Sequence, residues 1–193
     1  MNIARTGNPT REALEEIIAV LENGKKGFAF ASGMAAISTA IILFSQGDHV
    51  LITEDVYGGT YRIITKVLNR YGIEHTFVDT TNLEEIKQNI KQNTKLFYVE
   101  TPTNPIIKIT DIQDVSTLAK QNGALTFVDN TFLTPLLQKP LDLGADVVLH
   151  SATKYIGGHS DVTAGLAVVK EPATSTKTSI CTKRNRSHSR TAR

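Results

Sequence analysis

A lysine stands among small hydroxyl residues and glycines near the end of an apolar segment. Lys154 belongs to the run His150–Tyr155 (HSATKY), and Gly157 and Gly158 follow it. An exposed, solvated lysine is the ordinary alternative. At the carboxyl end of a strand, however, a lysine is placed where an enzyme would put a reactive amine. Lys154 is therefore the first candidate for covalent chemistry.

An acid and a helix start could act beside such an amine. Asp129 ends the apolar stretch 124–128, so its carboxylate must be paired or exposed, because an unpaired buried charge is costly. It is either a helix cap or surface acid, or the partner of a cationic ring nitrogen. Ser32-Gly33-Met34 follows a strand-like segment and opens a helical one. Free N–H groups there would favour an anion by about 0.3–1 kcal/mol, although a simple tight turn is equally compatible.

A metal site is not expected. His150, His159 and Asp161 are possible ligands, but no further partner accompanies them. The dinucleotide-binding, P-loop and zinc-protease signatures are also missing from the sequence.

Alternating helix and strand patterns must position these residues. Helical spacing runs over residues 9–21, 34–44, 61–71, 83–90 and 112–119, and strand-like segments cover 28–31, 49–53, 74–78, 95–100, 124–129 and 146–150. Residues 162–169 end the part of the chain that is expected to be ordered. This alternation predicts an α/β fold with a mostly parallel sheet and helices on both faces. Ligands of such sheets bind beyond the carboxyl ends of the strands, where the polar pairs Glu100-Thr101, Asp129-Asn130 and His150-Ser151 occur.

Composition separates the last 23 residues from the rest. Residues 171–193 carry a net charge of +5, and residues 1–170 carry −3. The segment is rich in Ser and Thr and lacks periodicity, so we expect a disordered basic tail. One cysteine, Cys181, excludes an internal disulfide, and no apolar signal core occurs near the N-terminus, which favours the cytoplasm. The longest apolar stretch, 33–44, is too short for a bilayer, and the acidic body makes nucleic acid an unlikely partner.

Six segments together resemble the Cys/Met-metabolism family of pyridoxal phosphate (PLP) enzymes, which includes cystathionine γ-synthase and γ-lyase. They occur in family order and are RTGNPT (5–10), ASGMAAI (31–37), DVYGGTYR (55–62), ETPTNP (100–105), VDNTF (128–132) and HSATKYIGGHSD (150–161). The resemblance implies the large PLP-binding domain of the aspartate aminotransferase type over residues 1–170. The tail 171–193 has no counterpart in it, so we expect the tail not to be native to the family.

The resemblance also implies roles for individual residues. Lys154 would form the Schiff base with PLP, and Asp129 would pair with the ring nitrogen. Tyr57 would stack on the ring and take part in proton transfer, and Asn104 would contact the phenolic oxygen. Arg5 would reach the phosphate of a neighbouring subunit. The residues implied at the phosphate are Gly33, Met34, Ser32, Ser151 and Thr153. The role of Arg5 implies a homodimer, usually doubled to a homotetramer.

The chain departs from the family in ways that leave alternatives open. Ile3 replaces a tyrosine that usually contacts the phosphate, and nothing matches the C-terminal domain that binds the substrate carboxylate. We therefore expect a transsulfuration enzyme of the γ-synthase, γ-lyase or β-lyase type, acting on sulfur amino acids or O-acylhomoserine and lacking its C-terminal domain. Gly59 stands where methionine γ-lyases tend to carry cysteine, which argues against that member. A PLP-binding fragment with impaired catalysis and an adaptor binding nucleic acid through residues 177–193 are the other two hypotheses.

Overall fold

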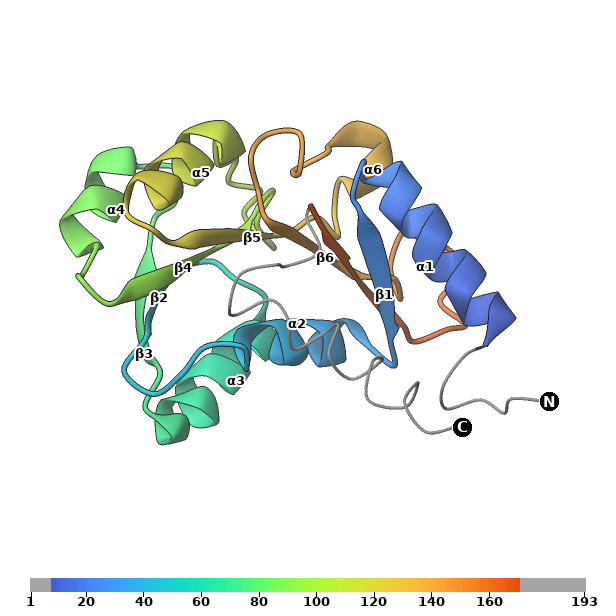
Figure 1. Ribbon diagram of the computed structural model, residues 1–193, viewed down its shortest axis with the longest axis horizontal. Coiled ribbons are helices and arrows are strands. Elements are labelled where there is room, and N and C mark those ends of the chain that lie inside the picture. The colour runs from blue at the N-terminus through green and yellow to red at the C-terminus, as the bar shows by residue number, and fades with distance from the viewer. Residues whose placement is uncertain (1–7, 171–193) are drawn as a thin grey trace, which may run out of the picture.

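A computed structural model describes residues 8–170 of the 193-residue chain (Figure 1). Arg5, Ile3 and the predicted basic tail lie outside the described residues. The helices are α1 (Pro9–Leu21), α2 (Gly33–Ile41), α3 (Gly58–Lys66), the 3₁₀ helix η1 (Leu68–Tyr71), α4 (Leu83–Asn89), α5 (Ile112–Gln121) and α6 (Thr134–Leu137). The strands are β1 (Lys26–Phe30), β2 (His49–Thr53), β3 (Glu74–Val78), β4 (Thr94–Glu100), β5 (Leu125–Asp129), β6 (Val147–Ser151) and β7 (Gly165–Val169).

The seven strands form one mixed sheet in the order β1-β7-β6-β5-β4-β2-β3. Strand β7 runs antiparallel to both of its neighbours, and the other four pairings are parallel. The prediction of a mostly parallel sheet is therefore confirmed. Parallel pairing also brings the carboxyl ends of β2, β4, β5 and β6 to one edge of the sheet, where the polar residues that end these strands meet.

Helices cover both faces of the sheet, as predicted (Figure 1). Buried residues of α1, α4 and α5 pack with Val99 and Val128 in one core, and α2 and α3 pack with Ile52 and Phe127 in the other. Alternate residues of the central strands point to opposite faces, so both sets of side chains are apolar. The two cores make the sheet a rigid support for the loops at its carboxyl edge.

Several local features differ from the sequence prediction. The helix expected over residues 34–44 ends at Ile41. The helix expected to run to Tyr71 ends at Lys66, and a separate 3₁₀ helix covers Leu68–Tyr71. Val67 interrupts the helix with φ −113° and ψ −62°, although its neighbour Leu68 keeps the apolar spacing and is buried. The short helix α6 was not predicted, because its four residues are too few to show a period.

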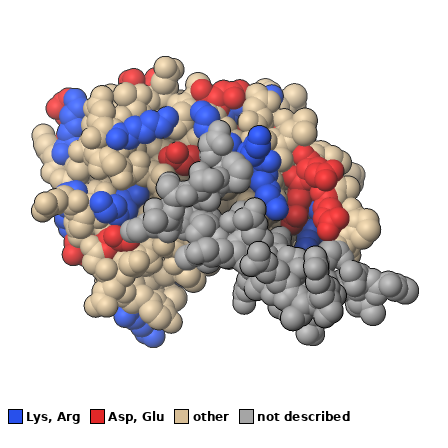
Figure 2. All heavy atoms as spheres, viewed as in Figure 1, with Lys and Arg blue, Asp and Glu red and all other residues tan. Residues whose placement is uncertain are grey.

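Charged residues of both signs are interspersed over the face shown in Figure 2. Acidic side chains gather over α1, whose sequence contains Glu12, Glu15 and Glu16. Within residues 8–170 no helix has the length and apolar character needed to cross a membrane.

Candidate functional site

A cavity of about 270 Å³ opens at the carboxyl edge of the sheet. All nine predicted site residues within residues 8–170 line it: Ser32, Gly33, Met34, Tyr57, Asn104, Asp129, Ser151, Thr153 and Lys154. They come from five separate segments of the chain and were selected from the sequence alone. Pro102, Thr131, Phe132 and Glu100 also line the cavity and were not among the predicted site residues.

One wall of the cavity is the start of α2. Ser32 caps this helix, because its Oγ accepts a hydrogen bond from the N–H of Ala35 (3.1 Å). A Cβ atom added at Gly33 would lie 2.7 Å from Cβ and 2.9 Å from Cα of Ser151. Glycine therefore lets the helix start approach β6 closely. The first N–H groups of the helix, with the Ser151 side chain beside them, form a site suited to an anion.

Asp129 forms the floor of the cavity at the end of β5. Its Oδ1 accepts hydrogen bonds from the N–H (3.1 Å) and hydroxyl of Thr131, and the Tyr98 hydroxyl lies 3.4 Å from Oδ2. The hydroxyl of Thr131 also accepts the N–H of Ser151 (2.8 Å), which ties the floor to the anion-binding wall. Burial raises the pKa of Asp129, while the hydrogen bonds from Thr131 act against that rise. A cation placed against this carboxylate would be strongly favoured.

Glu100 lies beside Asp129 and lines the same cavity. The two residues are register partners on the parallel strands β4 and β5. The N–H of Tyr57 donates to Glu100 Oε2 (2.8 Å), and the backbone of Asn104 also interacts with this carboxyl and acts to lower its pKa. Burial, followed by the charge of Asp129, raises the pKa of Glu100 from 4.5 to about 8. The position of Glu100 at a strand end could be seen in the sequence, but its hydrogen-bond partners could not.

Lys154 lies in the turn that follows β6. Its backbone is held by hydrogen bonds from its own N–H to Ser151 O (3.2 Å) and from Gly158 N–H to its carbonyl (2.8 Å). The Thr153 hydroxyl accepts the N–H of Ala164 (3.1 Å), which joins this turn to the approach to β7. Lys154 also lines an adjoining hollow with Asn104, so its side chain can reach molecules in both spaces.

The three residues considered as metal ligands do not form a metal site. His150 Nε2 lies 2.6 Å from Glu22 Oε1 in the interior, and both side chains are fully buried. His159 is exposed, with Nδ1 3.2 Å from the carbonyl of Gly157. Among residues 8–170 no group of three His, Cys, Asp or Glu side chains could hold a metal ion.

The Glu22–His150 pair belongs to a buried polar network that the sequence analysis missed. Asn130 Nδ2 donates to Glu22 Oε1 (3.0 Å) and to Gln138 O (2.9 Å), and Gln138 Nε2 donates to the carbonyl of Thr101 (3.2 Å). Both His150 and Asn130 directly neighbour cavity residues in sequence and, by the alternation of strands, point to the opposite face. The network therefore supports the strand ends from behind the cavity.

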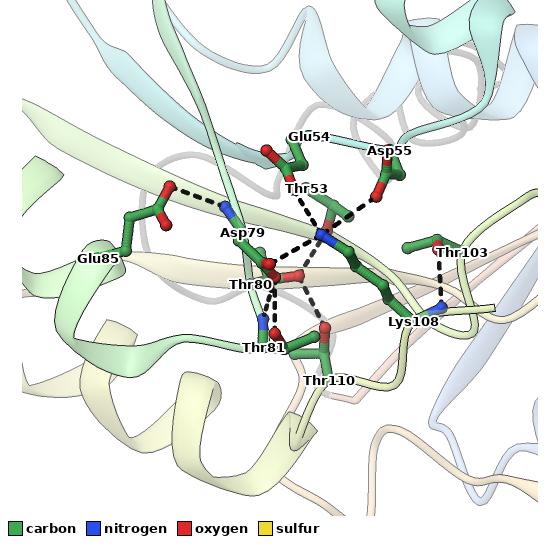
Figure 3. A network of polar contacts seen from close by, with 10 residues as sticks. All are labelled: Thr53, Glu54, Asp55, Asp79, Thr80, Thr81, Glu85, Thr103, Lys108 and Thr110. Atoms are coloured by element: carbon green, nitrogen blue, oxygen red, sulfur yellow. Dashed lines mark hydrogen bonds and ion pairs between the residues drawn. The ribbon is translucent and has the colours of Figure 1, made fainter. Parts of the chain in front are cut away.

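A second polar network holds the loops that carry Tyr57 and Asn104 from outside (Figure 3). Lys108 Nζ lies 2.6 Å from Glu54 Oε1, 2.8 Å from Asp79 Oδ2 and 3.5 Å from Asp55 Oδ2. The hydrogen bond to Lys108 lowers the pKa of Asp79. The loop after β4 is thereby joined to the ends of β2 and β3, close to two of the cavity residues.

Comparisons with known proteins agree with this geometry. A profile of the family described as "Cys/Met metabolism PLP-dependent enzyme" matches residues 2–187. The chain is 67% identical over 168 residues to cystathionine beta-lyase and 62% identical over 165 residues to cystathionine gamma-lyase, both from Bacillus subtilis; these matches cover 87% and 86% of this chain. The crystal structure of cystathionine gamma-lyase from Lactobacillus plantarum complexed with L-serine has a TM-score of 0.86 and 56% identity over 87% of this chain. The chain spans 43% and 44% of the two Bacillus relatives and 44% of that crystallised chain.

Proposed function

Since this chain belongs to the Cys/Met metabolism family of PLP-dependent enzymes, we propose that its cavity binds PLP through Lys154. We further propose that the whole protein is a transsulfuration enzyme of the cystathionine β-lyase, γ-lyase or γ-synthase type, acting on sulfur amino acids or O-acylhomoserine. One observation supports the site above others: residues from five distant segments line a single cavity, with Lys154 and Asp129 both on its wall.

The residues present fit PLP, an anionic phosphate ester with a basic ring nitrogen. The start of α2 approaches Ser151 without an intervening Cβ, which leaves backbone N–H groups available to a phosphate. The carboxylate of Asp129 is buried and suits a protonated ring nitrogen. Lys154 supplies an amine that lines the same space. Bound PLP would supply an electron sink for carbanion chemistry at the substrate.

Each side chain then has a distinct task in the proposal. Gly33 and Met34 bind the phosphate through their N–H groups, and the side chains of Ser32, Ser151 and Thr153 contribute to the same wall. Tyr57 stacks on the ring, and Asn104 contacts the phenolic oxygen. Ser151 and Asp129 are joined through Thr131, so the phosphate wall and the floor are held at a fixed separation.

Proton movement is assigned to Lys154 and Tyr57. Nζ of Lys154 accepts a proton from the substrate carbon and returns it to another, a task for a positioned amine. The phenol of Tyr57 takes part in the same transfers.

Assembly and location belong to the same proposal. Arg5 would reach the phosphate in a neighbouring subunit, which makes the protein a homodimer or homotetramer with an amino-acid substrate as its small-molecule partner. The single cysteine is compatible with a reducing cytoplasm. Neither a membrane nor a nucleic acid has a place in this function.

An absorbance titration of the 193-residue chain with PLP tests the proposal. We expect a near-visible band for covalently bound PLP in wild type and in the control Lys87→Ala, whose Nζ pairs with Glu84 on α4 outside the cavity. Lys154→Ala should lack the band. The same band in Lys154→Ala, or its loss in the control alone, would disprove the assignment. Cystathionine and O-acylhomoserine turnover would then separate an active enzyme from a PLP-binding chain without turnover.

A further inference from the structure

Glu100 is a buried acid to which neither the sequence analysis nor the proposed chemistry assigns a task. It is 7% exposed, lines the cavity and is the register partner of Asp129 in the β4–β5 pairing, where the charge of Asp129 acts on it. Two carboxylates so close together in the interior would repel each other, and each would lose its hydration. The position therefore requires an explanation in terms of protonation and partners.

The partners of Glu100 are backbone N–H groups of two different loops. Tyr57 N–H donates to Oε2 at 2.8 Å, from the loop between β2 and α3. The backbone of Asn104, in the loop after β4, interacts with the same carboxyl, and both backbone contacts act against the rise in the pKa of Glu100. Tyr57 and Asn104 are the two residues proposed to contact the PLP ring itself. One side chain thus holds the backbone of both ring contacts.

We propose that Glu100 is a positioning residue that works as a neutral carboxylic acid: it holds Tyr57 and Asn104 through their backbone N–H groups and leaves Asp129 as the single negative charge of the cavity floor. The role concerns residues of the proposed PLP site and in that respect rests on the proposed function. A carboxylic acid can accept both N–H groups and still provide a proton toward the neighbouring carboxylate.

The charged and titratable groups around Glu100 are compatible with this state. Asp129 on β5 disfavours a second negative charge, and the Tyr98 hydroxyl on β4 lies against Asp129 at 3.4 Å. Lys154 lines the cavity as its cation, and the phenol of Tyr57 lies on the loop that Glu100 holds. Burial raises the pKa of Asp129, and His150, on the other side of the sheet, acts against that rise. The raised pKa of Glu100, about 8, agrees with a neutral acid at pH 7.

Infrared difference spectra of the chain without PLP test the protonation state directly. The wild-type spectrum minus that of Glu100→Gln at pH 7 should contain the C=O band of one protonated carboxyl, because Glu100→Gln removes the only group proposed to carry that proton. A wild-type chain without the band would overturn the proposal. A band that persists in Glu100→Gln and disappears in Asp129→Asn would overturn it equally, because the proton would then reside on Asp129.

PLP affinity and the pH profile of unfolding test the positioning role. Glu100→Gln keeps an oxygen acceptor without a charge, so its PLP dissociation constant at pH 7 should stay within about threefold of wild type, whereas Glu100→Leu should bind at least tenfold more weakly. A tenfold loss in Glu100→Gln, or wild-type binding by Glu100→Leu, would contradict the role.

In the absence of PLP, the thermal unfolding midpoint of wild type should fall relative to that of Glu100→Gln as the pH rises from 5 to 8. Parallel pH profiles of the two midpoints would contradict a neutral acid. If wild type fails to bind PLP, the proposed function fails, and the infrared and unfolding results still decide the state of Glu100.

Discussion

Replacing Gly33 by alanine tests the close approach that forms the anion-binding wall. The new Cβ would lie 2.7 Å from Ser151 Cβ and 2.9 Å from Ser151 Cα. Apolar carbons pack at about 3.5–4.0 Å, so α2 and β6 must separate by roughly 1 Å. The nearest atoms belong to a strand in the middle of the sheet, which cannot move away as a flexible side chain would.

Overpacking of this kind costs about 1–3 kcal/mol, and the higher helix propensity of alanine offsets part of it. We expect a net loss of about 1–2 kcal/mol in the free energy of unfolding, and therefore a fall of roughly 2–8 °C in the midpoint for a chain of this size. Displacing the N–H groups at the start of α2 should remove about 1 kcal/mol from phosphate binding, or about a fivefold weaker PLP affinity.

Thermal unfolding followed by circular dichroism and a PLP titration measure the two effects. Gly58→Ala is the matched control, because Gly58 also begins a helix and its added Cβ would meet only the end of Arg62, at 3.4 Å from Nη1. The control should unfold and bind PLP as wild type does. Wild-type stability and affinity in Gly33→Ala would refute the reasoning from close packing.

Two further outcomes follow from the networks around the sheet. Lys108→Met should lower the unfolding midpoint and weaken PLP binding, because three carboxylates at the ends of two strands lose their shared cation. Lys108→Arg keeps the charge and should behave as wild type in thermal melts and PLP titrations. Equal effects of Met and Arg would show that charge is not the cause. His49 is fully buried between two threonine hydroxyls, and burial lowers its pKa to about 4. Between pH 6.5 and 4 the unfolded chain therefore binds more protons than the folded chain. As the pH falls from 7.5 to 5, the free energy of unfolding of wild type, measured in urea, should drop by about 2 kcal/mol relative to that of His49→Gln. Identical pH slopes for the two proteins would contradict this reasoning.

The α/β fold was predictable because its elements have local signals. Strand 49–53 was predicted with the bounds that the structure gives, and helix α1 covers the predicted residues 9–21, with the Asn8 side chain accepting the N–H of Thr10 at its start. The prediction of one helix through residue 71 was wrong at Val67, where the apolar spacing continues but the α-helical backbone conformation ends. Apolar spacing reports which side chains are buried, and the backbone can meet that requirement in more than one conformation.

The described candidate site was likewise predictable as a set of residues, because its motifs resemble those of a known family. Lys154, Asp129 and Ser32-Gly33-Met34 were also candidates from their places at strand ends and a helix start. Their assembly was not, because the order of strands in the sheet places β4 between β2 and β5, while β3, the strand before β4 in sequence, lies at the edge of the sheet. Glu100 illustrates the difference: its strand-end position was visible in the sequence, but its contacts with Tyr57 and Asp129 exist only once β2, β4 and β5 are adjacent.

The sequence, with its resemblance to a known family, therefore determined the class of fold, the segments that meet at the carboxyl edge and nine of the residues that line the cavity. Tertiary structure alone decided the pairing of Glu22 with His150 across 128 positions, the cluster of carboxylates around Lys108 and the altered pKa of Glu100. The physical reason is that apolar periods and helix signals act between near neighbours in the chain. Desolvation and charge coupling depend on distances through space, and folding is what sets those distances.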